Sequence, residues 1–327
     1  MSDAAGSSLS LLQTSRNPEG THVHEKGRQP FLGWQKLTKG TMMTRNHQRR
    51  IISAQRIGQH LRRRSVTASQ HQQPVDIHQF GVLTGGGLKA WLAILPRFTS
   101  YNGSGHVFGF DSFEGMPDED ASLKQPRNQK TKAWQAGGLN AAKMLNVTDW
   151  PTLRDVLTRN VGHPPEKTHF VRGFYNESLA NAAAVARRLR MRPAFLIDID
   201  SDIYTSAKQA LRFVLDAGVL APGTFVYYDD ISEFERWTVQ RRSSKPDGKD
   251  APLSEELRAH QEISLEYGLS WRSLAPLGRY SGPVPGLDWI LQRPASERGK
   301  VVPMYSYPPV LELISCGRCA ALLGRER

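Results

Sequence analysis

Two segments that each run from an apolar stretch directly into clustered aspartates constrain the fold of this chain most. The first is LIDIDSDIYTSA at Leu196–Ala207, and the second is GTFVYYDDI at Gly223–Ile231. The sequence between them has the apolar spacing of one helix, so this part predicts strand, helix, strand. Such units build parallel sheets, which bind ligands at the carboxyl ends of their strands. We therefore expect the aspartates to meet at one rim of a sheet.

Clustered carboxylates at one rim need a compensating charge. Like charges repel one another unless a cation or a proton offsets them. Mg²⁺ prefers oxygen ligands, so the aspartates predict a divalent metal beside a ligand crevice. The alternative gives the same aspartates a purely structural role, as helix caps and partners in salt bridges.

The rest of the chain alternates between strand-like and helix-like segments. The expected strands are VDIHQF (75–80), HVFGFD (106–111), THFVRGF (168–174), AFLIDID (194–200), TFVYYDD (224–230), SWRSLAP (270–276) and LDWILQR (287–293). Helices are expected after a glycine-rich turn at 81–87, over 176–190 with Asn176 as the N-cap, over 206–218 and over 254–268. The alternation is typical of a doubly wound α/β sheet.

Basic residues are concentrated at the N-terminus. Residues 1–75 carry 12 Lys and Arg against 3 Asp and Glu, whereas the remainder carries 31 against 28. We expect a largely disordered basic tail at 1–74 with a short helix over 47–64, a folded domain at 75–295 and a C-terminal extension at 296–327. Such a tail is typically solvated, but it can also bind nucleic acid or an acidic membrane surface, or direct a chain to an organelle.

Hydropathy and cysteine content indicate a soluble protein. No apolar run reaches the roughly 18 residues that span a bilayer, so we expect a soluble, cytoplasmic protein. Its two cysteines, Cys316 and Cys319, form a lone C-x-x-C pair. One pair supplies half of the ligands of a zinc site and no second pair exists, so we expect exposed thiols without a function.

A glycine-rich turn and a strand-end aspartate together indicate a nucleoside-bearing ligand. In GVLTGGG, at 81–87, the glycines let a ligand approach the backbone and the free N–H groups of the following helix. The turn lacks the G-x-G-x-x-G spacing, which argues against a dinucleotide. Asp111 ends the second expected strand, where a carboxylate can accept hydrogen bonds from ribose hydroxyls.

Five motifs resemble those of one family. GFDSFEGMP at 109–117 resembles the GFDSFEGLP signature of the macrocin O-methyltransferase family, which uses S-adenosylmethionine. QFGVLTGGG, FVRGFYNESLA, IDIDSDIYTSA and APGTFVYYDDI are similar to four further motifs of that family, in the same order. The resemblance covers about residues 75–294. It implies a Rossmann-like class I methyltransferase fold with a mostly parallel, seven-stranded sheet whose last strand is antiparallel.

The resemblance also implies which residues hold the cofactor. Gly81 and Gly85 would lie beside the methionine part of S-adenosylmethionine. Asp111 would hold the ribose, and Ser112 and Phe113 would approach the adenosine.

Three further positions match metal ligands. Asp200, Asp229 and Asp230 correspond to residues that bind magnesium in the metal-dependent members of the family. Asp198 and Asp202 are alternatives on the fourth strand, because this chain carries D-x-D-x-D there. A bound Mg²⁺ would orient the hydroxyls of the acceptor and lower their pKa.

One residue departs from the family pattern, and the general base is not assigned by it. Gln79 stands where the family has a glutamate, so it offers no carboxylate near the amino-acid end of the cofactor. His169 and His163 are candidates for a general base because histidine titrates near neutral pH, and His260 is equally available. Each of these histidines is also typical of a structural or surface position.

The sequence therefore predicts an S-adenosylmethionine-dependent O-methyltransferase, assisted by Mg²⁺, that acts on a hydroxyl of a small molecule or sugar moiety. A different class of function is a non-catalytic binding protein that keeps the fold and engages nucleic acid or membrane through its basic tail. Nothing in the sequence indicates a particular acceptor or oligomeric state.

Overall fold

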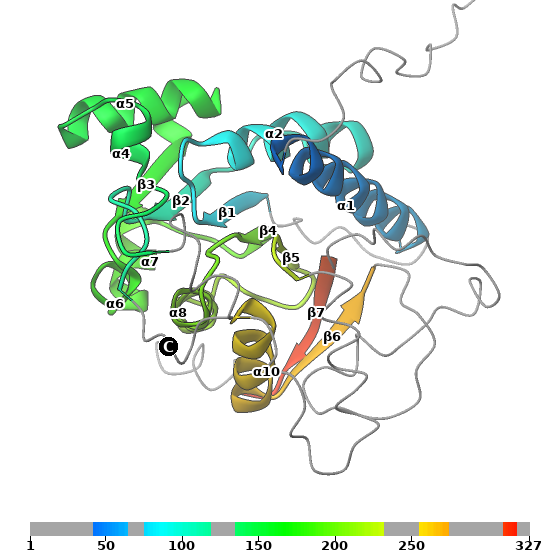
Figure 1. Ribbon diagram of the computed structural model, residues 1–327. Helices are drawn as coiled ribbons and strands as arrows, with labels where there is room; N and C mark the ends of the chain where they lie inside the picture. The colour runs from blue at the N-terminus through cyan, green and yellow to red at the C-terminus, as the bar shows by residue number, and fades with distance from the viewer. Residues whose placement is uncertain (1–41, 65–74, 119–134, 232–254, 275–309, 319–327) are drawn as a thin grey trace, which may run out of the picture. The chain divides into compact units, whose positions relative to one another are not determined.

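The chain is built around one seven-stranded sheet. The computed structural model describes residues 42–64, 75–118, 135–231, 255–274 and 310–318, all within the compact unit Met42–Arg327. The strand order is β3-β2-β1-β4-β5-β7-β6 (Figure 1). The strands are β1 Asp76–Phe80, β2 Val107–Asp111, β3 Thr168–Arg172, β4 Ala194–Ile199, β5 Phe225–Tyr228, β6 Leu269–Ser273 and β7 Val310–Cys316.

The first five strands are parallel, and β7 is antiparallel to both of its neighbours, β5 and β6. Every residue of β1, β4 and β5 is buried, as expected for parallel strands that are covered on both faces. The predicted doubly wound, mostly parallel sheet with an antiparallel last strand is therefore confirmed.

Helices cover both faces of the sheet. They are α1 Met42–Arg64, α2 Gly86–Phe98, α4 Ala141–Met144, α5 Trp150–Val161, α6 Tyr175–Ser178, α7 Ala182–Leu189, α8 Tyr204–Asp216 and α10 Glu255–Tyr267. One hydrophobic cluster joins α1, α2 and α5 to the sheet, with Ile57 and Trp91 among its members. A second cluster joins α7, α8 and α10 to it, with Leu211 and Leu257. Figure 1 shows the two layers, with α1 and α2 on one side and α8 and α10 on the other. None of the described helices is long and apolar enough to cross a membrane.

The strand register brings the functional segments to one rim. Phe80 pairs with Phe110 of β2 and with Ile199 of β4, and Ile199 pairs with Tyr228 of β5. These residues stand at or next to the ends of parallel strands, so the segments that follow them lie side by side.

Helix α1 is the main departure from the predicted domain boundaries. The sequence indicated a short helix over 47–64 within a tail, and α1 spans Met42–Arg64. Arg50, Ala54 and Ile57 are buried, so α1 packs on the domain whose start was predicted at residue 75. The prediction missed this packing because the buried stripe is short and includes an arginine, which is normally exposed. The rest of the predicted tail lies outside the described residues.

The segment predicted as one helix over 176–190 forms two. α6 ends at Ser178, and α7 begins after Asn181, whose side chain accepts a hydrogen bond from the Ala184 amide. Asn181, and not Asn176, is therefore the capping residue. The reason is local, because an asparagine side chain that bonds a following amide starts a new helix.

The C-terminal region also differs from the prediction. β7 comes from a stretch that was predicted to be an extension, whereas the expected strand LDWILQR lies outside the described residues. Cys316, at the end of β7, is disulfide-bonded and is therefore not the free thiol that was expected. Cys319 lies outside the described residues.

Candidate active site

The carboxyl rim of the sheet gathers most of the predicted site residues. The turn that starts at Gly81 follows β1, and Asp111 is the last residue of β2. Asp200 follows β4 directly, and Asp229 and Asp230 follow β5. Residues from four separate strands thus meet at one edge.

The glycine turn packs directly against the acidic segment after β4. Gly81 has a φ of 85°, and a Cβ there would lie 1.7 Å from the backbone oxygen of Asp200. Only glycine fits this position, because a side chain would be both strained and in collision with backbone. Gly85, with a φ of 88°, is the N-cap of α2. The contact with Asp200 involves Gly81 alone, and the predicted position of Gly81 and Gly85 beside the cofactor stays a prediction.

Hydrogen bonds to Asp111 fix the conformation of the glycine turn. Oδ2 of Asp111 accepts hydrogen bonds from the amides of Val82 and Leu83, both at 2.8 Å, and its Oδ1 accepts one from Phe113 at 2.7 Å. Burial raises the pKa of Asp111, and these amide hydrogen bonds oppose that rise. Ser112 donates to the Gly115 carbonyl at 2.7 Å and so closes the next turn.

Phe113 is buried against aromatic neighbours. Its φ is 57°, and its ring centroid lies 5.3 Å from that of Trp150. Asp111, Ser112 and Phe113 thus form one continuous loop at the end of β2, beside the glycine turn.

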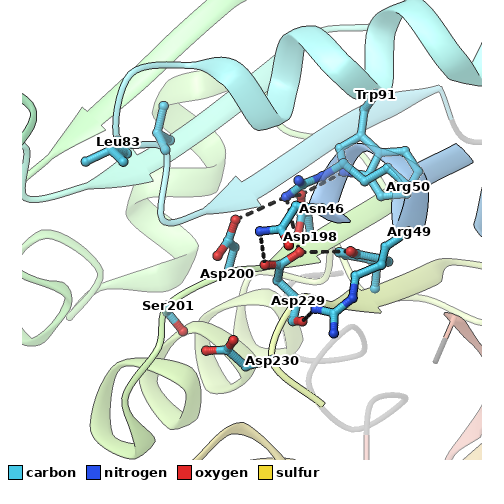
Figure 2. Close-up of polar contacts among 12 residues, drawn as sticks. Asn46, Arg49, Arg50, Leu83, Trp91, Asp198, Asp200, Ser201, Asp229 and Asp230 are labelled. Carbon is cyan, nitrogen blue, oxygen red and sulfur yellow. Dashed lines mark hydrogen bonds and ion pairs between the residues drawn. The ribbon is translucent and has the colours of Figure 1, made fainter. Parts of the chain in front are cut away.

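The acidic cluster contains a cation supplied by the chain itself. Nη2 of Arg50, from α1, lies 3.2 Å from Asp198 Oδ2, 3.1 Å from Asp200 Oδ2 and 3.7 Å from Asp229 Oδ1. Figure 2 shows the guanidinium pointing into these carboxylates. Burial alone would lower the pKa of Arg50, but the carboxylates, Asp198 foremost, raise it well above its usual value. Arg50 is therefore a permanent positive charge in the cluster.

Further donors surround the cluster. The indole Nε1 of Trp91 donates to Asp198 Oδ2 at 2.7 Å. Asn46 of α1 donates to Asp229 Oδ2 at 2.7 Å, and the hydroxyl of Tyr227 donates to Asp229 Oδ1 at 2.8 Å. Both oxygens of Asp229 are therefore engaged.

Two carboxylates at this rim, one buried and one partly exposed, hold protons more tightly than fully solvated ones. Burial raises the pKa of Asp198 to about 6, although the charge of Arg50 opposes the rise. Burial, reinforced by the charge of Asp229, also raises the pKa of Asp200.

Glu256, in the first turn of α10, extends the cluster and was not predicted. Its Oε2 accepts from the Asp230 amide at 3.2 Å, and its Oε1 accepts from the Ser201 amide at 3.4 Å. Burial, followed by the charges of Asp230 and Asp200, raises its pKa well above its usual value. In the sequence Glu256 appears only as an acidic residue in the first turn of a helix. Such a residue is expected for stabilisation of the helix N-terminus as much as for a binding site.

The described residues do not fit a divalent metal in this arrangement. Within those ranges, no group of three or more His, Cys, Asp or Glu side chains is placed to hold a metal ion. The carboxylate oxygens of Asp198, Asp200 and Asp229 instead converge on one nitrogen of Arg50. Asp202, with a φ of 61°, follows in the loop between β4 and α8.

The structure brings neither His163 nor His169 to this rim. His163 precedes β3 and contacts the Gly105 carbonyl at 3.0 Å, and His169 lies 2.8 Å from His106. Both histidines lie beside residues that precede β2, toward the amino ends of the strands. His260 is buried in α10 and contacts the hydroxyl of Tyr228 at 2.7 Å. Each of these histidines therefore has a structural contact.

The strand order and the glycine turn beside an acidic rim define a Rossmann-like methyltransferase fold. The sequence model of the macrocin O-methyltransferase family matches residues 23–245, a range that includes α1. The chain belongs to this family, and it is an S-adenosylmethionine-dependent O-methyltransferase. No curated protein matches it in sequence.

Two solved structures illustrate how distant the structural relatives are. The calicheamicin methyltransferase CalS11 is 17% identical, with 80% of this chain and 77% of that chain covered and a TM-score of 0.43. The O-methyltransferase NovP is 19% identical, with 56% of this chain and 64% of that chain covered and a TM-score of 0.36. Both TM-scores are too low to support statements about the site.

Proposed function

We propose that this protein methylates a hydroxyl group of a small molecule or of a sugar moiety, with S-adenosylmethionine bound across the ends of β1 and β2. The observation that carries the proposal is the pair of hydrogen bonds that the glycine turn donates to Asp111, beside the acidic rim. Family membership supports the same reaction class.

The residues at the two strand ends fit the cofactor. Asp111 accepts three backbone hydrogen bonds and lies partly exposed at the end of β2, where a ribose hydroxyl can reach its carboxylate. Gln79 Oε1 is buried and has no hydrogen-bond partner among the described residues. Its Nε2 would lie 2.1 Å from a Cβ at Gly87, which places this amide at the start of α2. An amide oxygen there suits an ammonium group, although it lacks the charge of a glutamate.

S-adenosylmethionine supplies an electrophilic methyl group, and the protein must hold the oxygen of the acceptor in line with it. Asp200 is the member of the Arg50 cluster that an acceptor can reach, because its side chain is 27% exposed while that of Asp198 is fully buried. In this proposal Asp200 accepts a hydrogen bond from the acceptor hydroxyl. Mg²⁺ has no part in it, because Arg50 already lies at the centre of the carboxylates.

Calorimetric titration of the full chain with S-adenosylmethionine tests the first step. Saturable binding at one site, followed by mass-spectrometric detection of a methylated product from a panel of nucleotide sugars, glycosides and phenols, would support the proposal. Absence of cofactor binding by a folded protein would contradict it and favour the non-catalytic alternative.

A further inference from the structure

The position of Arg50 assigns a role to the N-terminal helix that the sequence did not indicate. One nitrogen of Arg50 lies within 3.7 Å of an oxygen from each of Asp198, Asp200 and Asp229. The three oxygens therefore converge on a point that a nitrogen of the chain itself occupies. A magnesium ion bonded to the same oxygens at about 2.1 Å would lie in the space of that nitrogen.

Arg50 is buried between two aromatic side chains. Its side chain is 6% exposed, and its guanidinium carbon lies 5.9 Å from the ring centroid of Trp91 and 5.5 Å from that of Tyr227. The same two aromatic residues donate hydrogen bonds to Asp198 and Asp229. Aromatic faces attract a desolvated cation, and the polar atoms of these two residues donate to Asp198 Oδ2 and Asp229 Oδ1, which pair with it.

Contacts near both ends of α1 hold Arg50 in this position. Asn46 and Arg50 are four residues apart and reach the same acidic cluster from one face of the helix. Arg49 donates to the backbone carbonyl of Asp229 at 2.8 Å. At the other end of α1, His60 lies 3.0 Å from Glu312 of β7, and Arg64 pairs with the same carboxylate. The helix is thus tied to the sheet at both ends.

We propose that Arg50 is the resident cation of the acidic cluster and takes the place of a divalent metal ion. Arg50 is then a positioning residue that keeps Asp198, Asp200 and Asp229 together by its charge. Methyl transfer by this protein consequently proceeds without a divalent metal, a statement that rests on the proposed function. The exclusion of metal by Arg50 does not rest on it.

Manganese titration followed by electron paramagnetic resonance tests the exclusion. The full-length wild type is compared with Arg50→Met, which keeps an unbranched stem and removes the charged guanidinium group. We expect the wild type to leave Mn²⁺ free, and Arg50→Met to bind Mn²⁺ at least about tenfold more tightly, because three carboxylates lose their counter-ion.

Two variants serve as controls. Arg49→Met removes a neighbouring charge that contacts only a backbone carbonyl of the cluster, so it should leave Mn²⁺ free. Arg50→Lys restores a positive charge and should do the same. Circular dichroism shows whether each variant is folded. Tight Mn²⁺ binding by the wild type, or equally weak binding by the wild type and a folded Arg50→Met, would overturn the proposal.

A measurement on the wild type alone keeps the proposal testable if Arg50→Met does not fold. Methyl transfer measured in EDTA should equal that in Mg²⁺. Loss of transfer in EDTA that Mg²⁺ restores would overturn the proposal. A protein that fails to bind S-adenosylmethionine would contradict the proposed function instead, and the manganese titration would still decide the role of Arg50.

Discussion

At the scale of single residues, Asp111 shows how one buried carboxylate can shape a binding site before any ligand arrives. Its two oxygens accept hydrogen bonds from three backbone amides, two of which belong to the glycine turn. The sequence predicted a ribose-binding aspartate here, and that role stays a prediction. The structure adds that the same carboxylate sets the conformation of the turn.

Substitution of this carboxylate should affect both stability and binding. In Asp111→Asn an amide NH₂ group faces backbone donors, so we expect a loss of about 1–3 kcal/mol in the free energy of unfolding and about tenfold weaker binding of S-adenosylmethionine. Urea denaturation and calorimetric titration measure the two effects. Asp149→Asn is the matched control, because Asp149 caps α5 by accepting from the Thr152 amide and asparagine caps equally well. Unchanged cofactor affinity in Asp111→Asn would exclude a contact with the ribose.

His78 should make the stability depend on pH. It lies in β1 with its ring centroid 4.9 Å from that of Phe108, and both ring nitrogens lack hydrogen-bond partners among the described residues. Burial lowers its pKa from 6.5 to about 4, and the charge of Asp76 opposes the shift only partly. Because the unfolded chain binds a proton at higher pH than the folded one, stability is lost as the pH falls below about 6.5.

The size of this effect follows from the difference between wild type and His78→Leu. Between about pH 7.5 and pH 5.5 the wild type should lose about 1.4 kcal/mol more than the variant. Other groups titrate in the same interval, including Asp198, and they cancel in the comparison because they are present in both proteins. Urea denaturation at the two pH values measures this loss for both proteins. Parallel pH profiles of their free energies of unfolding would show that His78 does not titrate as described.

At the scale of elements, the packing of α1 against α2 is sensitive to the addition of a single atom. A Cβ at Gly58 would lie 1.7 Å from the backbone oxygen of Phe98, at the end of α2. Gly58→Ala should therefore destabilise the protein by about 1–3 kcal/mol through overpacking. Helix propensity alone predicts the opposite sign, a gain of about 1 kcal/mol, so the direction of the change is decisive.

Gln59→Ala is the matched control for this substitution, because Gln59 is exposed on the same helix. It should change the free energy of unfolding by less than about 0.5 kcal/mol. Urea denaturation of both variants gives the comparison. A Gly58→Ala protein as stable as the control would show that α1 does not pack closely against α2.

Most elements of the central domain were predictable because their signals are local. The apolar runs of β4 and β5 and the spacing in α2 and α8 are set by neighbouring residues in the sequence. The two helices α6 and α7 were merged because a cap by Asn181 depends on geometry that spacing does not reveal. β7 was missed because it joins the sheet by pairing with β5, a strand distant in sequence.

At the scale of the whole molecule, cofactor binding should stabilise the fold cooperatively. The proposed site spans the ends of β1 and β2 and rests on the turn fastened by Asp111, so a ligand there binds the native state only. At a concentration about 100 times its dissociation constant, S-adenosylmethionine should add about 2.7 kcal/mol to the free energy of unfolding. Thermal denaturation with and without the cofactor measures this, with adenine alone as the control ligand. No upward shift at saturation would contradict a site formed by the folded domain.

The sequence by itself determined the order of the five parallel strands, the family, and the arrival of Asp111, Asp200, Asp229 and Asp230 at one rim. These follow from local patterns and from the geometry of parallel strands, whose carboxyl ends face the same way. Only the tertiary structure decided that Arg50 enters the acidic cluster. Arg50 precedes Asp198 by 148 residues and Asp200 by 150, and its pairing depends on how α1 packs across the sheet. The sequence could indicate that the carboxylates need a cation, but not that the chain supplies one.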